Sequence, residues 1–372
     1  MKALFSAKST TPTYASPTLN SASAATAIPT SNPSVSYVPG KTTTSTNTVP
    51  SALSTTVTPK TVTDPRTQGV TWKVADFPRK HSEEPLPFSF VIALRTTGHT
   101  VSLPATLPAV PFVPVRLPTG APLSNPLVRS LTSPANLRQL LTPDNPLKAI
   151  LEHSDIVDGK YQGGFSLWEC SLDLCSMISD LARSNPASFA GQQILELGCG
   201  HALPAILSLL AGAEKVVMQD YNDDVIRLAT VPNVVENLKR VQNLPEPTAL
   251  QRASEHCHFI AGDWASLSGV MQTLPLAGQP SPQFQWIFAA ETIYSPSAEE
   301  VMLSLLTKHL APGGTALFAA KTFYFGVGGG TLHFAQTLRQ LKSPEGLPAF
   351  SVEDISTSSS MDRAILKIRR AN

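Results

Sequence analysis

The chain has 372 residues, more than one average domain needs, but 33 of them are prolines, so part of the length is not packed core. A formal net charge of +1 gives no overall electrostatic reason to bind nucleic acid or anionic lipid. The four cysteines, Cys170, Cys175, Cys199 and Cys257, form no Cys-x-x-Cys pair, which suits a reducing compartment. No apolar run reaches the roughly 18 to 20 residues of a membrane span, so we expect a soluble protein.

The first 145 residues differ in composition from the rest. Residues 1–70 are mostly Ser, Thr, Pro and Ala, too poor in large apolar groups to offset the entropy of ordering, so we expect a disordered leader. A transit peptide is the weaker alternative, because the first arginine is Arg66. Residues 71–145 form a Pro-rich extension whose apolar residues we expect in short strands or extended segments on the core. The main folded domain is then 146–372.

A helix should precede the first strand of that domain. Gly163-Gly164 is a flexible lead-in, and from Leu167 to Leu181 the apolar residues recur at helical spacing. Trp168 stands at the start of this helix, where it would lie over a ligand crevice. The alternative is a core tryptophan at a helix end.

The stretch 193–220 predicts a strand, a glycine turn, a helix and a second strand. The first strand is Gln193 to Leu197, and Gly198 and Gly200 let the backbone approach a ligand with no Cβ in the way. The crossover helix spans 202–211. The second strand ends at Asp220, twenty residues after Gly200, about the spacing at which an acid receives ribose hydroxyls. Leu203 stands where a dinucleotide fingerprint has its third glycine, so a nucleoside without pyrophosphate fits better. An ordinary turn remains the alternative.

The remaining chain continues the alternation of strands and helices. A helix from about Val225 should be broken or kinked by Pro232. Further elements are predicted as strand 258–261, strand 284–290, helix 297–310, a turn at 312–314, strand 315–321, a helix opening at Thr331, and a hairpin of 350–355 with 364–369. These seven strands predict an α/β fold, a doubly wound Rossmann-like sheet with a terminal antiparallel hairpin.

Ligands of such sheets bind at the carboxyl ends of the strands, beside the switch in strand order. Asp220 is our candidate for the ribose hydroxyls, Asp263 for the adenine amino group, and Trp264 for a face of the adenine or the flank of the ligand. The alternatives are a helix cap for Asp220, a turn residue for Asp263 and a core position for Trp264.

Two other features need separate interpretation. The glycine run 326–330 could cradle phosphate, but no Lys-Ser or Lys-Thr follows it, so a mobile loop that closes over a protein substrate is favoured. His256-Cys257-His258 lies on a strand, where adjacent side chains point to opposite faces, so we predict no metal site.

The segment from about Asp155 to Arg369 resembles the protein-histidine methyltransferases, a branch of the seven-strand S-adenosylmethionine-dependent enzymes. The resemblance rests on Glu196 to Gly200 and on six further motifs: Tyr161-Gln162-Gly163-Gly164 with Leu167-Trp168-Glu169-Cys170, Gln219-Asp220-Tyr221-Asn222, Pro232-Asn233-Val234, Gly262-Asp263-Trp264, Glu291-Thr292-Ile293-Tyr294, and Tyr324-Phe325-Gly326-Val327-Gly328-Gly329-Gly330.

The resemblance implies S-adenosyl-L-methionine as the cofactor. In addition to Gly200, the cofactor site that it implies consists of Trp168, Glu169, Cys170, Ser171, Leu172, Gly198, Gln219, Asp220, Tyr221, Gly262, Asp263, Trp264 and Ala290. Some members have serine at the Ala290 position, so this chain lacks that hydroxyl. Trp168 and Tyr221 are candidates to face the sulfonium by cation–π contact. Candidates to hold the far nitrogen of a target imidazole are Glu291, Tyr294, Lys321 and Tyr324.

The implied activity is methylation of a histidine ring nitrogen of a protein, and the family suggests a large-subunit ribosomal protein. We then expect residence in cytoplasm and nucleus, a monomer, and no direct contact with nucleic acid or membrane. Two alternatives are a protein-lysine methyltransferase of the same fold, which must first deprotonate an ammonium, and a non-catalytic scaffold.

Overall fold

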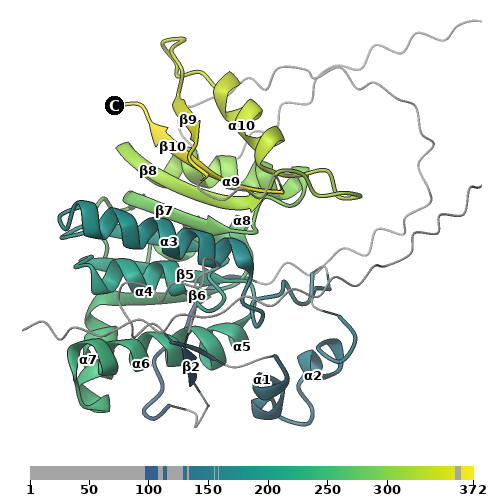
Figure 1. Ribbon diagram of the computed structural model, residues 1–372, viewed down its shortest axis with the longest axis vertical. Helices are drawn as coiled ribbons and strands as arrows, with labels where there is room; N and C mark the ends of the chain where they lie inside the picture. Colours follow the sequence, from purple (N-terminus) through teal and green to yellow (C-terminus); the bar gives the residue numbers. More distant parts are fainter. Residues whose placement is uncertain are drawn as a thin grey trace, which may run out of the picture. The chain divides into compact units, whose positions relative to one another are not determined.

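A computed structural model describes residues 97–107, 112–114, 129–131, 134–154, 156–157, 159–356 and 362–372, all within the compact unit Pro85–Asn372. Its centre is an eight-stranded sheet with helices on both faces (Figure 1). The predicted leader 1–70 lies outside the described residues, as does most of the extension 71–145.

The sheet has the order β1-β6-β5-β4-β7-β8-β10-β9. Its five parallel strands are β4 (Gln193–Leu197), β5 (Lys215–Asp220), β6 (Cys257–Ala261), β7 (Phe284–Ala290) and β8 (Leu310–Lys321). The strand β10 (Arg363–Arg370) runs antiparallel to both β8 and β9 (Phe350–Asp354), which confirms the terminal hairpin. A separate antiparallel pair joins β2 (Phe112–Pro114) and β3 (Arg129–Leu131).

Among the described residues, the main sheet has one strand more than the seven predicted. The eighth strand is β1 (His99–Thr100), which comes from the Pro-rich extension and pairs antiparallel with the end of β6. A strand of two residues is too short to show an alternation of apolar and polar residues. Its formation depends on pairing with the edge of β6. Val101 follows β1 and is buried in the core.

The helices of the described residues are α1 (Pro134–Leu140), α2 (Pro146–Ile150), α3 (Glu169–Ser184), α4 (Leu203–Leu210), α5 (Asp223–Val225), α6 (Val231–Gln242), α7 (Glu246–His256), α8 (Trp264–Met271), α9 (Pro296–His309) and α10 (Thr331–Gln340). None of them combines the length and apolar character needed to cross a lipid bilayer.

Alternate residues of the parallel strands enter two cores. Ile194 and Val216 pack with α3, α4, α6 and α7 on one face, whereas Leu195 and Val217 pack with α8, α9 and α10 on the other. Because both faces are covered, every residue of β4 is buried, including the polar Gln193 and Glu196. A third cluster joins Leu137 of α1 and Leu147 of α2 to the segment 161–165 and to the helix after β5.

Of the break or kink predicted at Pro232, the break is wrong, and so is the turn predicted at Pro312-Gly313-Gly314. Pro232 does not break its helix, because a π-helical turn, Ile226–Thr230, precedes α6 and changes the hydrogen-bond spacing just before the proline, with the N–H of Val231 donating to the carbonyl of Ile226. The Pro312-Gly313-Gly314 turn is instead part of β8. There the pairing with β7 shifts from Phe284 opposite Leu310 to Trp286 opposite Thr315.

Candidate active site

The switch in strand order lies between β4 and β7. From β4 the chain passes to β5 on one side, while β7 pairs with β4 on the other. Gly198, directly after β4, and Ala290, the last residue of β7, therefore lie at neighbouring strand ends. Gln219 joins this edge to the next strand. Its side chain accepts from the N–H of Gly198 at 3.1 Å and donates to the carbonyl of Gly262 at 2.7 Å. The amide of Gln219 therefore orders the backbone around the predicted cofactor site.

Gly198 and Gly200 adopt left-handed backbone conformations, with φ of +61° and +49°. A Cβ on Gly198 would lie 3.1 Å from the methyl carbon of Thr292, and one on Gly200 would lie 3.0 Å from the carbonyl oxygen of Gly164. Larger residues would thus be strained and crowded at both positions. The turn after β4 is a cradle that admits neighbouring backbone closely.

Asp220 is buried, with 4% of its surface exposed, at the end of β5. Its Oδ2 accepts from the N–H of Gly200 at 3.0 Å and its Oδ1 from the N–H of Asn222 at 3.2 Å. Burial raises the pKa of Asp220 to about 6, although these backbone donors oppose the shift. The N-cap of α5 is Asn222, so the helix-cap interpretation of Asp220 does not apply.

Asp263 caps α8, because its Oδ1 accepts from the N–H of Ser266 at 2.8 Å. The contact of Asp263 with the adenine amino group remains a prediction. The second carboxylate oxygen is a hydrogen-bond acceptor, as that contact requires. Trp264 is partly buried against the core, and its Cζ2 lies 3.6 Å from a Cβ built on Gly198. The indole thus stands beside the glycine cradle, 6.5 Å from the ring of Tyr294 between centroids.

The five candidates at the start of α3 have different surroundings. Trp168 is the N-cap and its indole N–H donates to the carbonyl of Gly163 at 3.0 Å. The carboxylate of Glu169 points away to Arg363 of β10, at 2.8 Å. Ser171 is half-buried, and Leu172 packs on the core. Contacts of Glu169 with a cofactor would therefore come from its backbone at the helix start.

The motif after β5 holds the segment 159–164. The hydroxyl of Tyr221 donates to the carbonyl of Gly159 at 2.8 Å. Asn222 accepts from the N–H of Gln162 at 3.3 Å and donates to the carbonyl of Lys160 at 2.8 Å. Motifs that lie some 60 residues apart in sequence are thus joined directly.

A second link runs from α6. Asn233 donates to the carbonyl of His201 at 3.0 Å, and the Nε2 of His201 lies 2.8 Å from the carbonyl oxygen of Phe165. Burial lowers the pKa of His201, so the ring is neutral here. Asn222 was noted only as the last residue of the Gln219-Asp220-Tyr221-Asn222 motif, and His201 was not predicted as a site residue, because a single asparagine or histidine carries no periodic signal.

Glu291 lies directly after β7 and adopts φ of +56°, which is rare for a residue with a side chain. The thiol of Cys170 donates to its Oε1 at 2.8 Å, and the hydroxyl of Tyr324 donates to its Oε2. Burial and the neighbouring carboxylate raise the pKa values of the Cys170 thiol and the Tyr324 phenol, so both remain protonated donors.

The other two catalytic candidates lie at the sides of this group. Lys321 is exposed, and its Nζ lies 5.7 Å from the centroid of the Tyr324 ring. Tyr294 donates its hydroxyl to Oε1 of Gln162 at 3.2 Å, in the segment held by Asn222. The structure thus joins Glu291 with Tyr324 directly and places Lys321 beside the Tyr324 ring. It connects Tyr294 to Gln162 instead.

The glycine run between β8 and α10 is fastened at several points. The N–H of Tyr324 donates to Gly329 at 3.0 Å, the N–H of Gly329 to Tyr294 at 3.3 Å, and the N–H of Gly330 to Oε1 of Glu299 at 3.0 Å. A Cβ on Gly329 would lie 2.4 Å from the carbonyl carbon of Tyr294, so only glycine fits that contact. Closure of this loop over a substrate remains a prediction.

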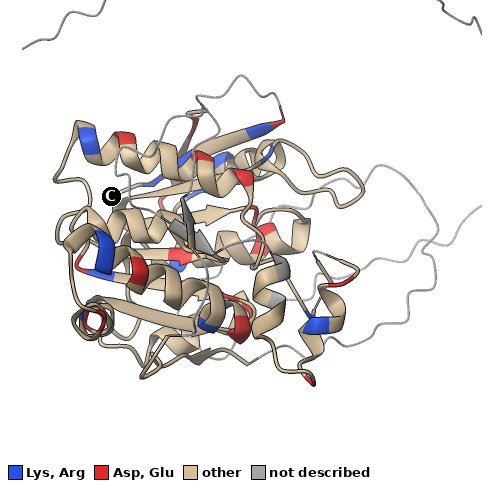
Figure 2. Cartoon of the chain, turned by 60° about the horizontal axis from the view of Figure 1, so that its bottom comes forward, with Lys and Arg blue, Asp and Glu red and all other residues tan. Residues whose placement is uncertain are grey.

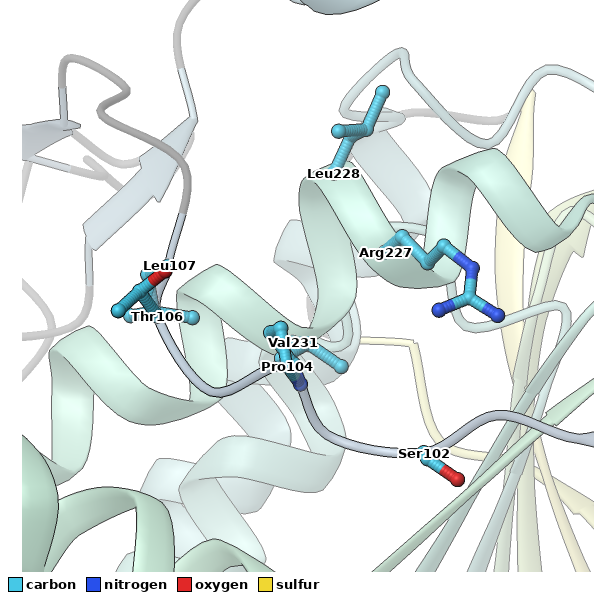
Figure 3. A pocket seen from close by; sticks show the side chains of 7 residues that line it. All are labelled: Ser102, Pro104, Thr106, Leu107, Arg227, Leu228 and Val231. Carbon is cyan, nitrogen blue, oxygen red and sulfur yellow. The ribbon is translucent and has the colours of Figure 1, made fainter.

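A surface hollow lies away from these groups. Figure 3 shows its lining, which comes from the segment after β1, from the π-helical turn and from the first residue of α6: Ser102, Pro104, Thr106, Leu107, Arg227, Leu228 and Val231. The lining includes none of the predicted site residues, and its one charged residue is Arg227. The polar and titratable residues at the carboxyl edge of the sheet therefore favour that edge as the active site. No group of three or more His, Cys, Asp or Glu in the described residues is arranged to hold a metal ion.

The chain is similar in sequence to several histidine protein methyltransferases. The chain is 33% identical over 219 residues to a histidine protein methyltransferase 1 homolog of Dictyostelium discoideum, covering 59% of this chain and 62% of that protein. It is 36% identical over 236 residues to histidine protein methyltransferase 1 of Schizosaccharomyces pombe, covering 55% and 66%. This chain belongs to the histidine protein methyltransferase family.

The members of this family that it matches are longer than the matched region, and the chain spans about half to two thirds of their length. No family model matches the chain. Among solved structures, the N-methyltransferase NodS of Bradyrhizobium japonicum is 18% identical with a TM-score of 0.35, covering 53% of this chain and 95% of that chain. That likeness is too distant to bear on the site.

Proposed function

We propose that this protein transfers the methyl group of S-adenosyl-L-methionine to a ring nitrogen of a histidine in a protein. The observation that carries the proposal is the Glu291 carboxylate, held by Cys170 and Tyr324 at the strand end beside the glycine cradle. Membership of the family supports the activity, since the matched relatives are named as histidine protein methyltransferases.

The residues at the carboxyl edge fit the cofactor. Gly198 and Gly200 leave no side chain between backbone and ligand, and Asp220 offers a carboxylate to the ribose hydroxyls. Trp264 beside Gly198 suits a face of the adenine. When bound, the cofactor supplies a methyl group on a positively charged sulfur.

The acceptor chemistry suits Glu291. A histidine with a pKa near 6.5 is mostly neutral at pH 7, so one ring nitrogen is already nucleophilic without a strong base. The other ring N–H can donate to the Glu291 carboxylate, which fixes the tautomer and therefore which nitrogen reacts. With the cofactor bound, the target ring would gain a positive charge as the N–C bond formed, and the electron pair of the broken C–S bond would remain with the sulfur. A fixed carboxylate beside the ring stabilises that charge. The ring N–H proton then leaves to solvent.

Radiolabelled S-adenosylmethionine and a whole-cell protein extract would test the activity. After complete acid hydrolysis of the labelled protein, we expect the label in 1- or 3-methylhistidine. Label found in methyl-lysine alone would instead support the lysine enzyme, and no cofactor binding by calorimetry would support a scaffold.

We further propose a large-subunit ribosomal protein as the acceptor, with action in the cytoplasm and nucleus, as a monomer. Support for the acceptor and the location comes from the sequence resemblance alone. Absence of direct nucleic-acid contact is supported by the net charge of +1 and by the interspersed acidic and basic residues of the described elements (Figure 2). Mass spectrometry of the labelled peptide identifies the acceptor, and light scattering measures the oligomeric state.

A further inference from the structure

We infer that Cys170 is a positioning residue for Glu291 and not a contact of the cofactor. The inference rests on the proposed function and changes the role that the sequence resemblance gives to Cys170. It assigns to this thiol the task of orienting the carboxylate that receives the target imidazole.

Three separate elements meet at this carboxylate. Cys170 belongs to the first turn of α3, Glu291 follows β7, and Tyr324 lies in the loop between β8 and α10. Each carboxylate oxygen accepts one hydrogen bond, Oε1 from the Cys170 thiol at 2.8 Å and Oε2 from the Tyr324 hydroxyl. Because each oxygen accepts from a donor on a different element, the two hydrogen bonds restrict rotation of the carboxylate. An ionised carboxylate has about four lone-pair sites, so acceptor capacity remains for a substrate N–H.

The side chain of Cys170 is unsuited to a cofactor contact. Its exposed fraction is 0%, and its sulfur is already 2.8 Å from Glu291. Burial, together with the charge of Glu291, raises the pKa of the thiol, so the S–H proton remains available for donation at neutral pH. A serine at this position could donate the same hydrogen bond, whereas alanine or valine could not.

The backbone of Glu291 supports the same role. Its φ of +56° ends the extended backbone conformation of β7. The N–H of Glu291 donates to the carbonyl of Ala319 at 2.9 Å. Residues with side chains persist in this conformation when their surroundings fix them, commonly at functional sites. The two side-chain donors supply that fixation at the carboxylate end.

The same helix offers a matched control. Cys175 is as fully buried as Cys170 but packs among apolar side chains of the core. Cys175→Ala removes a buried thiol of the same size without touching Glu291. Loss of activity from a general loosening of α3 would appear in both variants, whereas loss through Glu291 would appear in Cys170 variants alone.

The experiment measures methylhistidine formed from radiolabelled S-adenosylmethionine and whole-cell protein extract, at varied cofactor concentration, with the full chain. For Cys170→Ala we expect turnover to fall on the order of tenfold to a hundredfold at saturating cofactor, with the cofactor Kd unchanged by calorimetry. Cys170→Ser should restore most of the turnover. Cys170→Val, which keeps more volume, replaces the alanine variant if that one does not fold.

A double-variant comparison separates positioning from packing. In a Glu291→Ala background, whose residual turnover we expect to be measurable, Cys170→Ala should cost less than threefold more, because the acceptor of the thiol hydrogen bond is gone. Turnover of Cys170→Ala equal to that of Cys175→Ala would overturn the inference, as would a rise in cofactor Kd that matches the loss of activity, or full additivity with Glu291→Ala. No methylhistidine from the unaltered protein would instead refute the proposed function itself.

Discussion

The carboxylate of Asp220 accepts a hydrogen bond from the backbone N–H of Gly200, with 3.0 Å between Oδ2 and the nitrogen. This contact joins the end of β5 to the turn after β4, so the acid and the glycine cradle are positioned together. A change at Asp220 should therefore affect both the charge available to a ligand and the shape of the turn.

Asp220→Asn should weaken cofactor affinity by about tenfold or more, because a charge-assisted hydrogen bond to a ribose hydroxyl contributes about 1.5 to 3 kcal/mol. The asparagine keeps a carbonyl oxygen for the N–H of Gly200, so the fold should persist. Calorimetry with S-adenosylmethionine measures the effect. Asp223→Asn, in a residue that pairs with Arg227 on the surface, is the control. An unchanged Kd in the folded Asp220 variant would exclude the ribose assignment.

Cofactor affinity should also depend on pH. Burial raises the pKa of Asp220 to about 6, and ribose hydroxyls donate to the ionised form. Affinity should be full well above pH 6 and should fall as the pH drops through this value. Titrations between pH 5 and 8 should show the decline in the unaltered protein and a flatter profile in Asp220→Asn. Equal pH profiles for the two proteins would contradict the prediction.

Stability should fall with rising pH because of Glu196, whereas cofactor affinity should rise. Burial raises its pKa to about 8, so between its unfolded pKa near 4.3 and pH 8 the folded state binds more protons than the unfolded state. The free energy of unfolding should therefore decrease as the pH rises through this window. Glu196→Gln can still accept from the N–H of Ala205, at 2.8 Å in the unaltered protein, and should reduce the decrease. Urea unfolding at pH 5 and 8.5 tests this, and an identical decrease in both proteins would refute it.

Asn222→Ala should destabilise the protein by about 1 to 3 kcal/mol, because it removes two hydrogen bonds, from the N–H of Gln162 and to the carbonyl of Lys160. Amide hydrogen exchange should accelerate in the segment 160–165. Asn185→Ala, at an exposed position after α3, provides the comparison. If both variants unfold at the same urea concentration, the link between the two motifs contributes nothing to stability.

Deletion of residues 1–70 should leave cofactor affinity and stability unchanged, because that segment is too poor in apolar groups to contribute to a core. A deletion that reaches residue 107 should be harmful, since it removes β1 and Val101. Thermal unfolding and calorimetry compare the two truncated proteins. A tenfold loss of cofactor affinity in the shorter deletion would show that the domain begins earlier.

The central parallel strands could be predicted because their apolar runs are bounded by glycines, acids and prolines. The strand Gln193–Leu197 was predicted to the residue, and so was Phe284–Ala290. The short β1 could not, because its pairing depends on a distant edge and not on its own two residues. Likewise, the strand ends predicted that Glu291 lies at the site, but the donors from Cys170 and Tyr324 require α3 and the glycine loop to meet in space.

The four buried thiols have a practical consequence. Cys170, Cys175, Cys199 and Cys257 are all free and buried, and burial raises the pKa of each, that of Cys257 to about 12. Alkylating reagents attack the thiolate, so the folded chain should resist them. Rates of modification at the four positions, read by mass spectrometry, would report how often α3, the turn after β4 and the strand β6 open. The cysteines thus serve as internal reporters of unfolding without any added label.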